Sequence, residues 1–235
     1  MESVDERISV AALIPAYEPG DRLVKLVEEL SASFRRIIVV DDGSRSETAK
    51  SVFAKIKPKV EKIIVHSENR GKGAAIKSAL NYLGASDVVI ADADGQHLPE
   101  DIVKVAKAVP GRAGLVLGSR VFRLGETPFR SIWGNWWTQR IFRLATGLSI
   151  RDTQTGLRGV PASLVESIAA LPGERYEFEM VMLAAARRHR EKPLEVAIRT
   201  VYFENNRLSH FSPLKDTICI FRALFRYLKE ESIKS

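Results

Sequence analysis

The sequence contains a single cysteine and lacks any long apolar segment. Cys219 is the only cysteine in 235 residues, so no disulfide can form within the chain and a reducing compartment is expected. No apolar run approaches the roughly 20 residues that a membrane-spanning helix needs. The first residues, Met1 to Arg7, are polar and acidic, unlike a secretory signal. We therefore expect a cytoplasmic protein without a membrane span.

The charge balance is basic. Lysine and arginine number 36 against 29 aspartate and glutamate residues, which gives a formal net charge of +7. This excess predicts an anionic partner, such as phosphates, nucleic acid or an acidic membrane face. The length suits one α/β domain, alone or with an appendage, and 45% apolar residues suffice for a sizeable core.

Short apolar runs alternate with helical periodicity in the first half of the chain. Runs rich in β-branched residues predict strands at Ile8 to Ile14, Arg36 to Val40, Val60 to Val65, from Val88 onward, and Leu115 to Leu117. The intervening spacing predicts helices at Leu23 to Leu30, at Glu47 to Lys55, after Gly73 as far as Leu83, and at Pro99 to Val109. This alternation favours a doubly wound, mostly parallel α/β sheet flanked by helices.

The pattern is less regular after Arg120. We expect a helix from Tyr176 to Arg190 and a strand from Leu194 to Phe203, antiparallel at the sheet edge. A final helix is expected to begin at Pro213.

Two carboxylates follow the fourth predicted strand. Asp92 and Asp94 are one residue apart, and alternate residues of an extended segment point the same way. Ligands of open α/β sheets bind at the carboxyl ends of the strands, so both side chains are expected at a ligand site. Two neighbouring anions need a neutralising cation, and oxygen ligands suit Mg²⁺ or Mn²⁺ bound together with a diphosphate. The alternative is a polar turn, in which Asp and Gly are common.

The loops after the predicted strands carry motifs that occur together in one known family. They read Ile14-Pro15-Ala16-Tyr17-Glu18, Val39-Val40-Asp41-Asp42-Gly43-Ser44, Asn69-Arg70-Gly71-Lys72-Gly73, Asp92-Ala93-Asp94-Gly95-Gln96, Gly118-Ser119-Arg120 and Asp152-Thr153-Gln154-Thr155-Gly156-Leu157-Arg158. Over about residues 8 to 160 the sequence resembles the family 2 glycosyltransferases, especially the dolichyl- and polyprenyl-phosphate sugar synthases. The resemblance implies a GT-A, Rossmann-like fold. It also implies inverting, metal-dependent sugar transfer from a UDP- or GDP-linked donor to a polyprenyl (dolichyl or undecaprenyl) phosphate.

The resemblance implies roles for individual residues. Donor-binding residues would be Pro15, Ala16, Tyr17, Glu18, Asp41, Asp42, Lys72, Asp92 and Ala93. Metal ligands would be Asp92, Asp94 and Gln96. Acceptor or phosphate contacts would come from Arg120, Arg130, Arg158 and Arg207, and the catalytic residues would be Asp94, Arg120 and Asp152. The chain departs from the dolichyl-phosphate mannose synthases at Ser209-His210, where those enzymes have Ser-Lys.

The sequence does not decide between a lipid-phosphate acceptor and a hydroxyl acceptor. A lipid phosphate is already an anion and needs no general base, whereas a hydroxyl acceptor needs a carboxylate such as Asp152, Glu177 or Glu179. Transfer to a hydroxyl of a cell-envelope glycan is therefore one alternative, and a degenerate GT-A domain that acts as a binding or regulatory partner is another. The spacing around Lys72 does not match an ATPase P-loop. His97 is expected to be a solvated or loop-packing side chain.

The last predicted helix is amphipathic and basic. Its apolar stripe comprises Leu214, Ile218, Phe221, Phe225 and Leu228, and its basic stripe comprises Lys215, Arg222, Arg226 and Lys229. Such a helix can lie on an anionic membrane, or it can pack on the body of the protein or on another subunit.

The expected organisation is a GT-A domain over residues 1–211 and an amphipathic appendage, rather than a separate domain, over 212–235. Residues 212–231 would contact an anionic membrane, so the protein would be peripheral at the cytoplasmic face of the membrane. A homo-oligomer or a membrane-protein partner is compatible with the same surface. Nucleic acid is not expected as a partner, because the basic residues are dispersed and the proposed cleft is acidic.

Overall fold

The first half of the chain folds as alternating strands and helices. The computed structural model describes residues 7–121, 129–189, 191–199 and 213–234. In chain order the first elements are β1 (Ala11–Ala16), α1 (Asp21–Ser31), β2 (Ile37–Asp41), α2 (Glu47–Ile56), η1 (Lys57–Lys59), β3 (Lys62–Val65), α3 (Lys72–Leu83), β4 (Val88–Ile90), α4 (Pro99–Lys107) and β5 (Val116–Arg120). All of these strands and α-helices were predicted from periodicity, with differences of a few residues at their ends.

The second half contains more helix. Its elements are α5 (Phe129–Thr146), β6 (Arg158–Val160), α6 (Ala162–Ala169), α7 (Glu177–Ala185), η2 (Ala186–Arg188), β7 (Leu194–Ile198) and α8 (Pro213–Lys234). The predicted helix from Tyr176 therefore ends earlier and tightens into η2. The predicted strand ends at Ile198, and residues 200–203 lie outside the described ranges.

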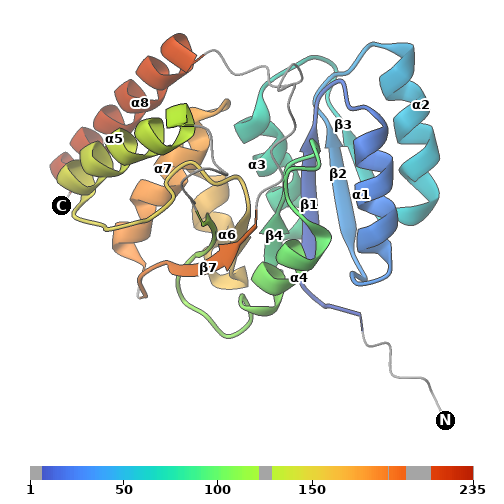
Figure 1. Cartoon of the computed structure of the whole chain (residues 1–235), viewed down its shortest axis with the longest axis horizontal. Helices are drawn as coiled ribbons and strands as arrows, with labels where there is room; N and C mark the ends of the chain where they lie inside the picture. The colour runs from blue at the N-terminus through green and yellow to red at the C-terminus, as the bar shows by residue number, and fades with distance from the viewer. Residues whose placement is uncertain (1–6, 122–128, 190, 200–212, 235) are drawn as a thin grey trace.

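The seven strands form one mixed sheet in the order β3-β2-β1-β4-β6-β5-β7, with helices packed on its two faces (Figure 1). β7 lies at the edge, as predicted, but it pairs parallel to β5 with Val116 opposite Leu194, so the predicted antiparallel orientation was wrong. Because β6 is antiparallel to β5, the chain leaves β6 at the end of the sheet where β5 begins, and the helices between β6 and β7 return it to that same end. The antiparallel strand is β6, which pairs with both β4 and β5.

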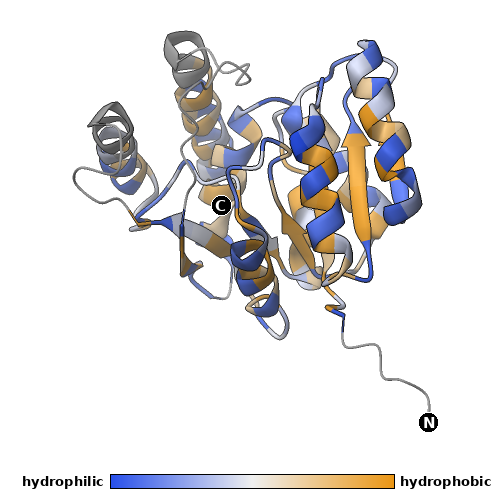
Figure 2. Cartoon of the chain, turned by 45° about the vertical axis from the view of Figure 1, so that its right-hand side comes forward, coloured by the Kyte–Doolittle hydropathy of each residue, from blue (hydrophilic) through white to orange (hydrophobic). Residues whose placement is uncertain are grey.

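Side-chain alternation along β1 divides the core into two layers. Ala12 and Ile14 face the layer formed with α1, α2 and α4. Ala11 and Leu13 face the opposite layer, which α3, α6, α7 and α8 cover. Figure 2 shows the strands as mainly hydrophobic and the outer helices as mixed, which is the expected pattern for helices that cover a buried sheet.

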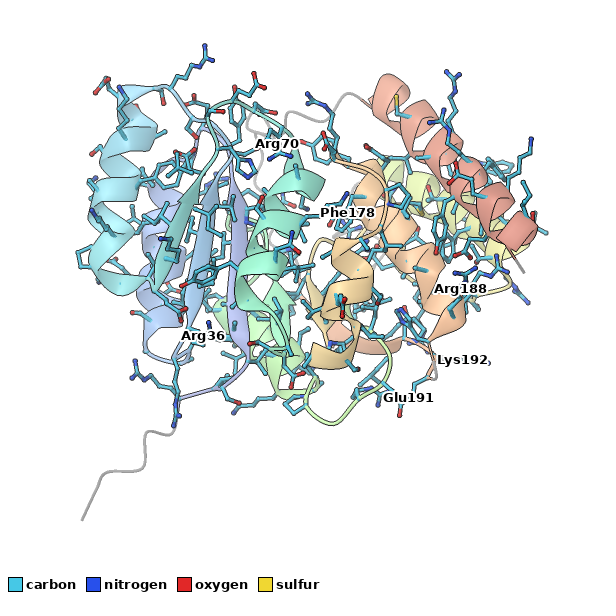
Figure 3. The ribbon with its side chains drawn as sticks, turned by 180° about the vertical axis from the view of Figure 1, so that it is seen from behind. Arg36, Arg70, Phe178, Arg188, Glu191 and Lys192 are labelled. Atoms are coloured by element: carbon cyan, nitrogen blue, oxygen red, sulfur yellow. The ribbon has the colours of Figure 1, made fainter. Side chains whose placement is uncertain are left out.

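Helix α8 packs against α7 through a face that partly matches the predicted apolar stripe, since Phe221 and Leu228 of that stripe are partly buried against the core. Leu224 and Tyr227 are buried, whereas Phe225 of the predicted stripe is 53% exposed. On the same helix Glu231 forms an ion pair with Arg188 of η2, in which Arg188 Nη1 and Glu231 Oε1 are 3.0 Å apart. Figure 3 shows Arg188 beside this helix. The side chains of 214 and 218 lie outside the described residues. Within the described ranges, no helix combines the length and apolarity that a bilayer crossing requires.

The packing of α8 predicts a contrast between two neighbouring residues. Leu224→Ala should lower the free energy of unfolding by roughly 2–5 kcal/mol, because it removes a fully buried side chain. Phe225→Ala is the matched control and should change it by less than about 0.5 kcal/mol, since that ring is mainly exposed. Urea denaturation measures both values. Equal effects would contradict the observed docking of α8.

Candidate active site

The direction in which the chain adds strands to the sheet reverses between β1 and β4. From β1 the chain proceeds outward to β2 and β3, and it then returns to place β4 on the other side of β1. Such a switch point opens a crevice at the carboxyl ends of the strands, which is the usual ligand site of open α/β sheets. The loops that follow β1 and β4 carry Tyr17, Glu18, Asp92 and Asp94, so the predicted donor and metal residues meet there.

The loops after β1 and β2 are locked to each other. Ala16 lies opposite Asp41 in the sheet, and Pro15 lies opposite Val40. The Glu18 backbone N–H donates to Ser44 Oγ at 2.8 Å, while Glu18 Oε1 accepts from the backbone N–H of Arg45 at 2.7 Å.

The same loops carry a strained residue and an exposed ring. Glu18 has a φ of 49°, unusual for a residue other than glycine, so its interloop contacts hold a strained backbone in place. Tyr17 is 38% exposed at this rim.

Asp41 and Asp42 serve different contacts although they are adjacent. Asp41 Oδ1 accepts from the backbone N–H of Ser44 at 2.8 Å, which closes the turn after β2. Asp42 is 3% exposed, and its oxygens accept from the backbone N–H groups of Arg70 at 3.0 Å and Gly71 at 2.7 Å. His66 Nδ1 also lies 2.7 Å from Asp42 Oδ1. The arrangement gives Asp42 the task of anchoring the loop before α3, and direct donor contact by this residue stays a prediction.

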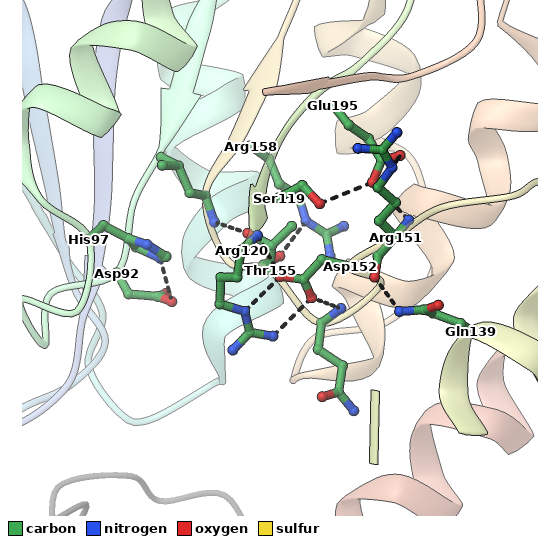
Figure 4. A network of polar contacts seen from close by, with 12 residues as sticks. Asp92, His97, Ser119, Arg120, Gln139, Arg151, Asp152, Thr155, Arg158 and Glu195 are labelled. Atoms are coloured by element: carbon green, nitrogen blue, oxygen red, sulfur yellow. Dashed lines mark hydrogen bonds and ion pairs between the residues drawn. The ribbon is translucent and has the colours of Figure 1, made fainter. Parts of the chain in front are cut away.

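Asp92 lies between two basic side chains. Its Oδ1 is 2.6 Å from Lys72 Nζ, and its Oδ2 is 3.4 Å from His97 Nε2. Burial alone would raise the pKa of Asp92, but the charge of Lys72 and the contact with His97 outweigh it and lower the pKa. The pKa of Lys72 is raised, because Asp92 and Glu179 overcome the opposing effect of burial. Asp92 is thus firmly anionic. Of the two environments expected for His97, solvated or loop-packing, the structure shows the second, since its side chain is buried against this carboxylate (Figure 4).

Asp94 is the less compensated carboxylate of the pair. Its Oδ1 accepts from the backbone N–H of Gln96 at 2.9 Å, and no donor to Oδ2 is found among the described residues. Burial and the neighbouring charge of Asp92 raise its pKa, so the local field disfavours a second negative charge. Ala93 between them packs against the core.

Asp92, Asp94 and Gln96 offer oxygen atoms of the type that Mg²⁺ and Mn²⁺ bind. A cation would relieve the uncompensated charge at Asp94, so the donor set fits such an ion. Among the described side chains, no group of three or more His, Cys, Asp or Glu residues forms a complete metal cage. The two carboxylates match a site that shares its ion with a diphosphate and water.

Arg120 and Asp152 form a bidentate ion pair on the other side of the site. Arg120 Nε and Nη2 donate to the two carboxylate oxygens at 2.6 and 2.9 Å, and Asp152 is fully buried (Figure 4). The backbone N–H of Gln154 also donates to Asp152 Oδ1 at 3.1 Å. This geometry fixes the plane of the Arg120 guanidinium at the end of β5, where a planar fork suits a phosphate.

Arg158 and Gly156 tie the following loop to the rest of the site. Arg158 is 1% exposed, and its guanidinium donates to the backbone carbonyls of Thr155, at 3.0 Å, and of Glu179. Burial lowers its pKa. These contacts favour a structural task over the predicted phosphate contact. A Cβ at Gly156 would lie 2.2 Å from Asp92 Oδ2, so glycine is required for the loop to cover Asp92.

Two predicted phosphate-binding side chains, Arg130 and Arg207, lie outside the described residues. The structure also reveals contacts that the sequence motifs did not indicate. Lys72 Nζ lies 3.0 Å from Glu179 Oε1, although the two residues are separated by 107 positions and only tertiary packing brings them together. No local signal in the sequence predicts this pair.

Comparisons with known proteins place these motifs in a family. The profile described as "Glycosyl transferase family 2" matches residues 11–169. An uncharacterised protein of Methanocaldococcus jannaschii is 31% identical over 94% of this chain and 92% of its own length. A UDP-N-acetylglucosamine–dolichyl-phosphate N-acetylglucosaminyltransferase of Methanococcus voltae is 31% identical over 82% of this chain and 85% of its own. Human dolichyl-phosphate beta-glucosyltransferase is 25% identical over 89% of this chain and 72% of its own length.

Solved structures share the architecture at low sequence identity. Mannosyl-3-phosphoglycerate synthase from Rubrobacter xylanophilus superposes with a TM-score of 0.62 and 17% identity, covering 96% of this chain and 75% of that one. A mannosyltransferase from Pyrobaculum calidifontis, in complex with GDP-Man and Mn²⁺, superposes with a TM-score of 0.56 and 16% identity, covering 86% of this chain and 58% of that one. These similarities confirm the predicted GT-A fold.

The family profile covers most of the sheet and its loops, and the 31% identical relatives extend over most of the chain. The predicted resemblance is therefore confirmed: this chain belongs to glycosyl transferase family 2, on the side of the dolichyl- and polyprenyl-phosphate sugar transferases, and it is a glycosyltransferase.

Proposed function

We propose that this glycosyltransferase transfers a sugar, with inversion and with the help of a divalent cation, from a nucleoside-diphosphate sugar to a polyprenyl phosphate. The observation that carries the proposal is the pairing of the site's carboxylates. Each carboxylate considered as a general base is already engaged, whereas Arg120 is held in place as a phosphate-binding fork. Relatives named for dolichyl-phosphate acceptors support the same acceptor class.

The donor would bind in the crevice between β1 and β4. Tyr17 is exposed at the end of β1, Asp41 lies opposite Ala16 at the end of β2, and Lys72 and Asp92 supply a fixed charge pair. A carboxylate can accept hydrogen bonds from a ribose or a base, and a lysine can pair with a phosphate. The donor base is expected to be uracil or guanine.

Asp94, Asp92 and Gln96 would hold Mg²⁺ or Mn²⁺ when the donor is bound. Asp94 suits the ion best, because its Oδ2 has no donor among the described residues and its charge is the least compensated. The cation supplies neutralisation of the charge that develops on the leaving diphosphate. A Mn²⁺ ion accompanies GDP-Man in the structurally similar mannosyltransferase, which supports the assignment.

The three candidate bases are committed to other contacts. Asp152 binds the guanidinium of Arg120, and Glu179 binds Lys72. Glu177 Oε1 accepts from the backbone N–H groups of Glu174 and Arg175 at 3.0 and 3.2 Å, which holds the turn that leads into α7. A hydroxyl acceptor would need one of these carboxylates to take a proton, whereas a phosphate acceptor would not.

The proposed reaction is a single displacement. An oxygen of the acceptor phosphate forms a bond to the anomeric carbon of the sugar. The bond from that carbon to the donor's β-phosphate oxygen breaks, and the nucleoside diphosphate leaves with the electron pair. Attack from the opposite face inverts the configuration. Arg120 would hold the acceptor phosphate in line, and Asp152 would keep its guanidinium oriented.

The lipid acceptor would be reached from a membrane surface formed by α5 and α8, which neighbour each other (Figure 1). Trp136 and Trp137 on α5 are 43% and 49% exposed, and Phe225 on α8 is 53% exposed. Exposed basic residues flank them, namely Arg140, Arg143, Arg222, Arg226 and Lys229. Aromatic rings interleaved with basic residues suit an anionic lipid interface, at the cytoplasmic face of the membrane in this proposal.

The acceptor class can be tested by direct assay. The protein should glycosylate a short polyprenyl phosphate when given the matching UDP- or GDP-sugar and Mn²⁺, and it should leave the corresponding polyprenol unmodified. Chromatography of the lipid product measures both reactions, and a hydrolysed sample gives the anomeric configuration. Transfer to the polyprenol or to a soluble glycan would instead support a hydroxyl acceptor.

Asp94→Asn should remove metal-dependent donor binding while leaving the fold intact. For the wild type, a nucleoside diphosphate at about one hundred times its Kd adds ~2.7 kcal/mol to stability. For a chain of this length, that raises the Tm by roughly 5–10 °C. The part of the shift that requires Mn²⁺ should vanish in the variant. Asp21→Asn, an exposed control on α1, should behave as wild type. A full Mn²⁺-dependent shift in the Asp94 variant would refute the assigned metal contact.

The double variant Trp137→Ala/Phe225→Ala should weaken binding to phosphatidylglycerol-containing vesicles by about tenfold or more, since burying one large side chain contributes roughly 1.5–3 kcal/mol. Co-sedimentation measures the bound fraction. Val65→Ala/Tyr82→Ala removes two other exposed apolar side chains and should have no effect. Equal loss in both double variants, or no loss in either, would argue against this membrane surface.

A further inference from the structure

Lys72 occupies an unusual position at the start of α3. It is the first residue of the helix, where the dipole favours anions and disfavours a lysine. The preceding backbone is fixed, because Gly71 has a φ of 107° and its N–H donates to the buried Asp42 carboxylate. A cation held against the helix dipole by a rigid loop requires compensating charges nearby.

Two carboxylates from different parts of the chain supply that compensation. Lys72 Nζ lies 2.6 Å from Asp92 Oδ1 and 3.0 Å from Glu179 Oε1. The side chains of Lys72 and Glu179 are only 16% and 15% exposed, so water screens this contact weakly. An ammonium has three N–H donors, and two are used here. No third partner is found among the described residues.

The close packing of α7 on α3 brings Glu179 into contact with Lys72. The backbone N–H of Ala74 donates to the Glu174 carbonyl at 2.9 Å, which docks the first turn of α3 on the segment before α7. A Cβ at Gly73 would lie 2.5 Å from the Phe178 Cβ, so only glycine permits this approach, and Figure 3 shows Phe178 at this contact. Glu179 is the next residue after Phe178, so the same approach of the two helices places its side chain beside Lys72.

On the basis of the function proposed above, we propose that Glu179 is a positioning residue that holds Lys72 against Asp92, so that Lys72 acts as the chain's own cation for the donor diphosphate. Lys72 then presents its remaining N–H to a phosphate oxygen beside the predicted metal residues. Glu179 contacts neither donor nor acceptor and exerts its effect through Lys72 alone.

The general-base role and the positioning role of Glu179 have different experimental consequences. Glu179 was a candidate general base, which would have to give up its pairing with Lys72 to accept a proton. Its loss would then alter the chemical step for a hydroxyl acceptor. As a positioning residue, its loss alters affinity for the diphosphate and does so only when Lys72 is present.

The test is a double-mutant cycle on nucleotide binding. Isothermal titration calorimetry would compare nucleoside mono- and diphosphates of uracil, guanine, adenine and cytosine, with EDTA and with Mn²⁺, for the full chain. Lys72→Met should weaken diphosphate binding about tenfold, the effect of losing one charge-assisted hydrogen bond, while monophosphate binding changes less. Glu179→Gln should weaken diphosphate binding severalfold in the wild-type background and have no further effect in the Lys72→Met background.

Controls keep the outcomes distinct. Lys72→Arg retains the charge and should keep most of the diphosphate affinity. Glu166→Gln removes an exposed carboxylate on α6 and should bind as wild type. Glu179→Gln weakening binding equally with and without the Lys72 side chain would overturn the proposal, as would an unchanged diphosphate affinity in Lys72→Met. A wild-type protein that binds none of the nucleotides would overturn the proposed function itself.

Discussion

The ion pair between Lys72 and Asp92 is the interaction on which the site depends. It joins the start of α3 to the loop after β4, and the same ammonium reaches Glu179 on α7. Three elements from distant parts of the sequence therefore converge on one charge. A partly buried charge remains stable only if it is paired, so each partner requires the others. Loss of either carboxylate would leave an imperfectly compensated lysine between two helices.

Glycines make that convergence sterically feasible. Gly73 lets α3 approach Phe178, and Gly156 lets the loop before β6 cover Asp92 Oδ2. In both places an added Cβ would lie closer than 3 Å to its neighbour. The glycines in these motifs are thus required by close packing around the carboxylate, and they do not need to touch a ligand to be necessary for function. A sequence motif shows that a glycine is present but does not show which neighbour demands it.

Most of the fold could be predicted because its signals are local. Strand and helix periods and the positions of turn residues are properties of adjacent residues, and they gave the first five strands and the helices between them. β6 was missed because it has only three residues. β7 was assigned the wrong direction because its direction depends on the end of the sheet to which the preceding helices return the chain. Asp92 and Asp94 were recognised through their spacing. The contacts Lys72–Glu179 and Asp42–His66 join residues far apart in sequence, so only the folded chain reveals them.

The antiparallel direction of β6 explains why the two halves of the site look different in the sequence. In the parallel strands the predicted site residues lie at or after the strand's end, as Asp41 ends β2 and Asp92 comes shortly after β4. β6 runs the other way, with Arg158 opposite Ile90, so its beginning lies at the rim where the parallel strands end. The residues that reach the site from this strand therefore precede it, and Asp152 and Gly156 are among them. One reversed strand brings the segment that orients Arg120 against the segment that carries Asp92, and this juxtaposition places Arg120, the proposed phosphate contact, beside the predicted donor crevice.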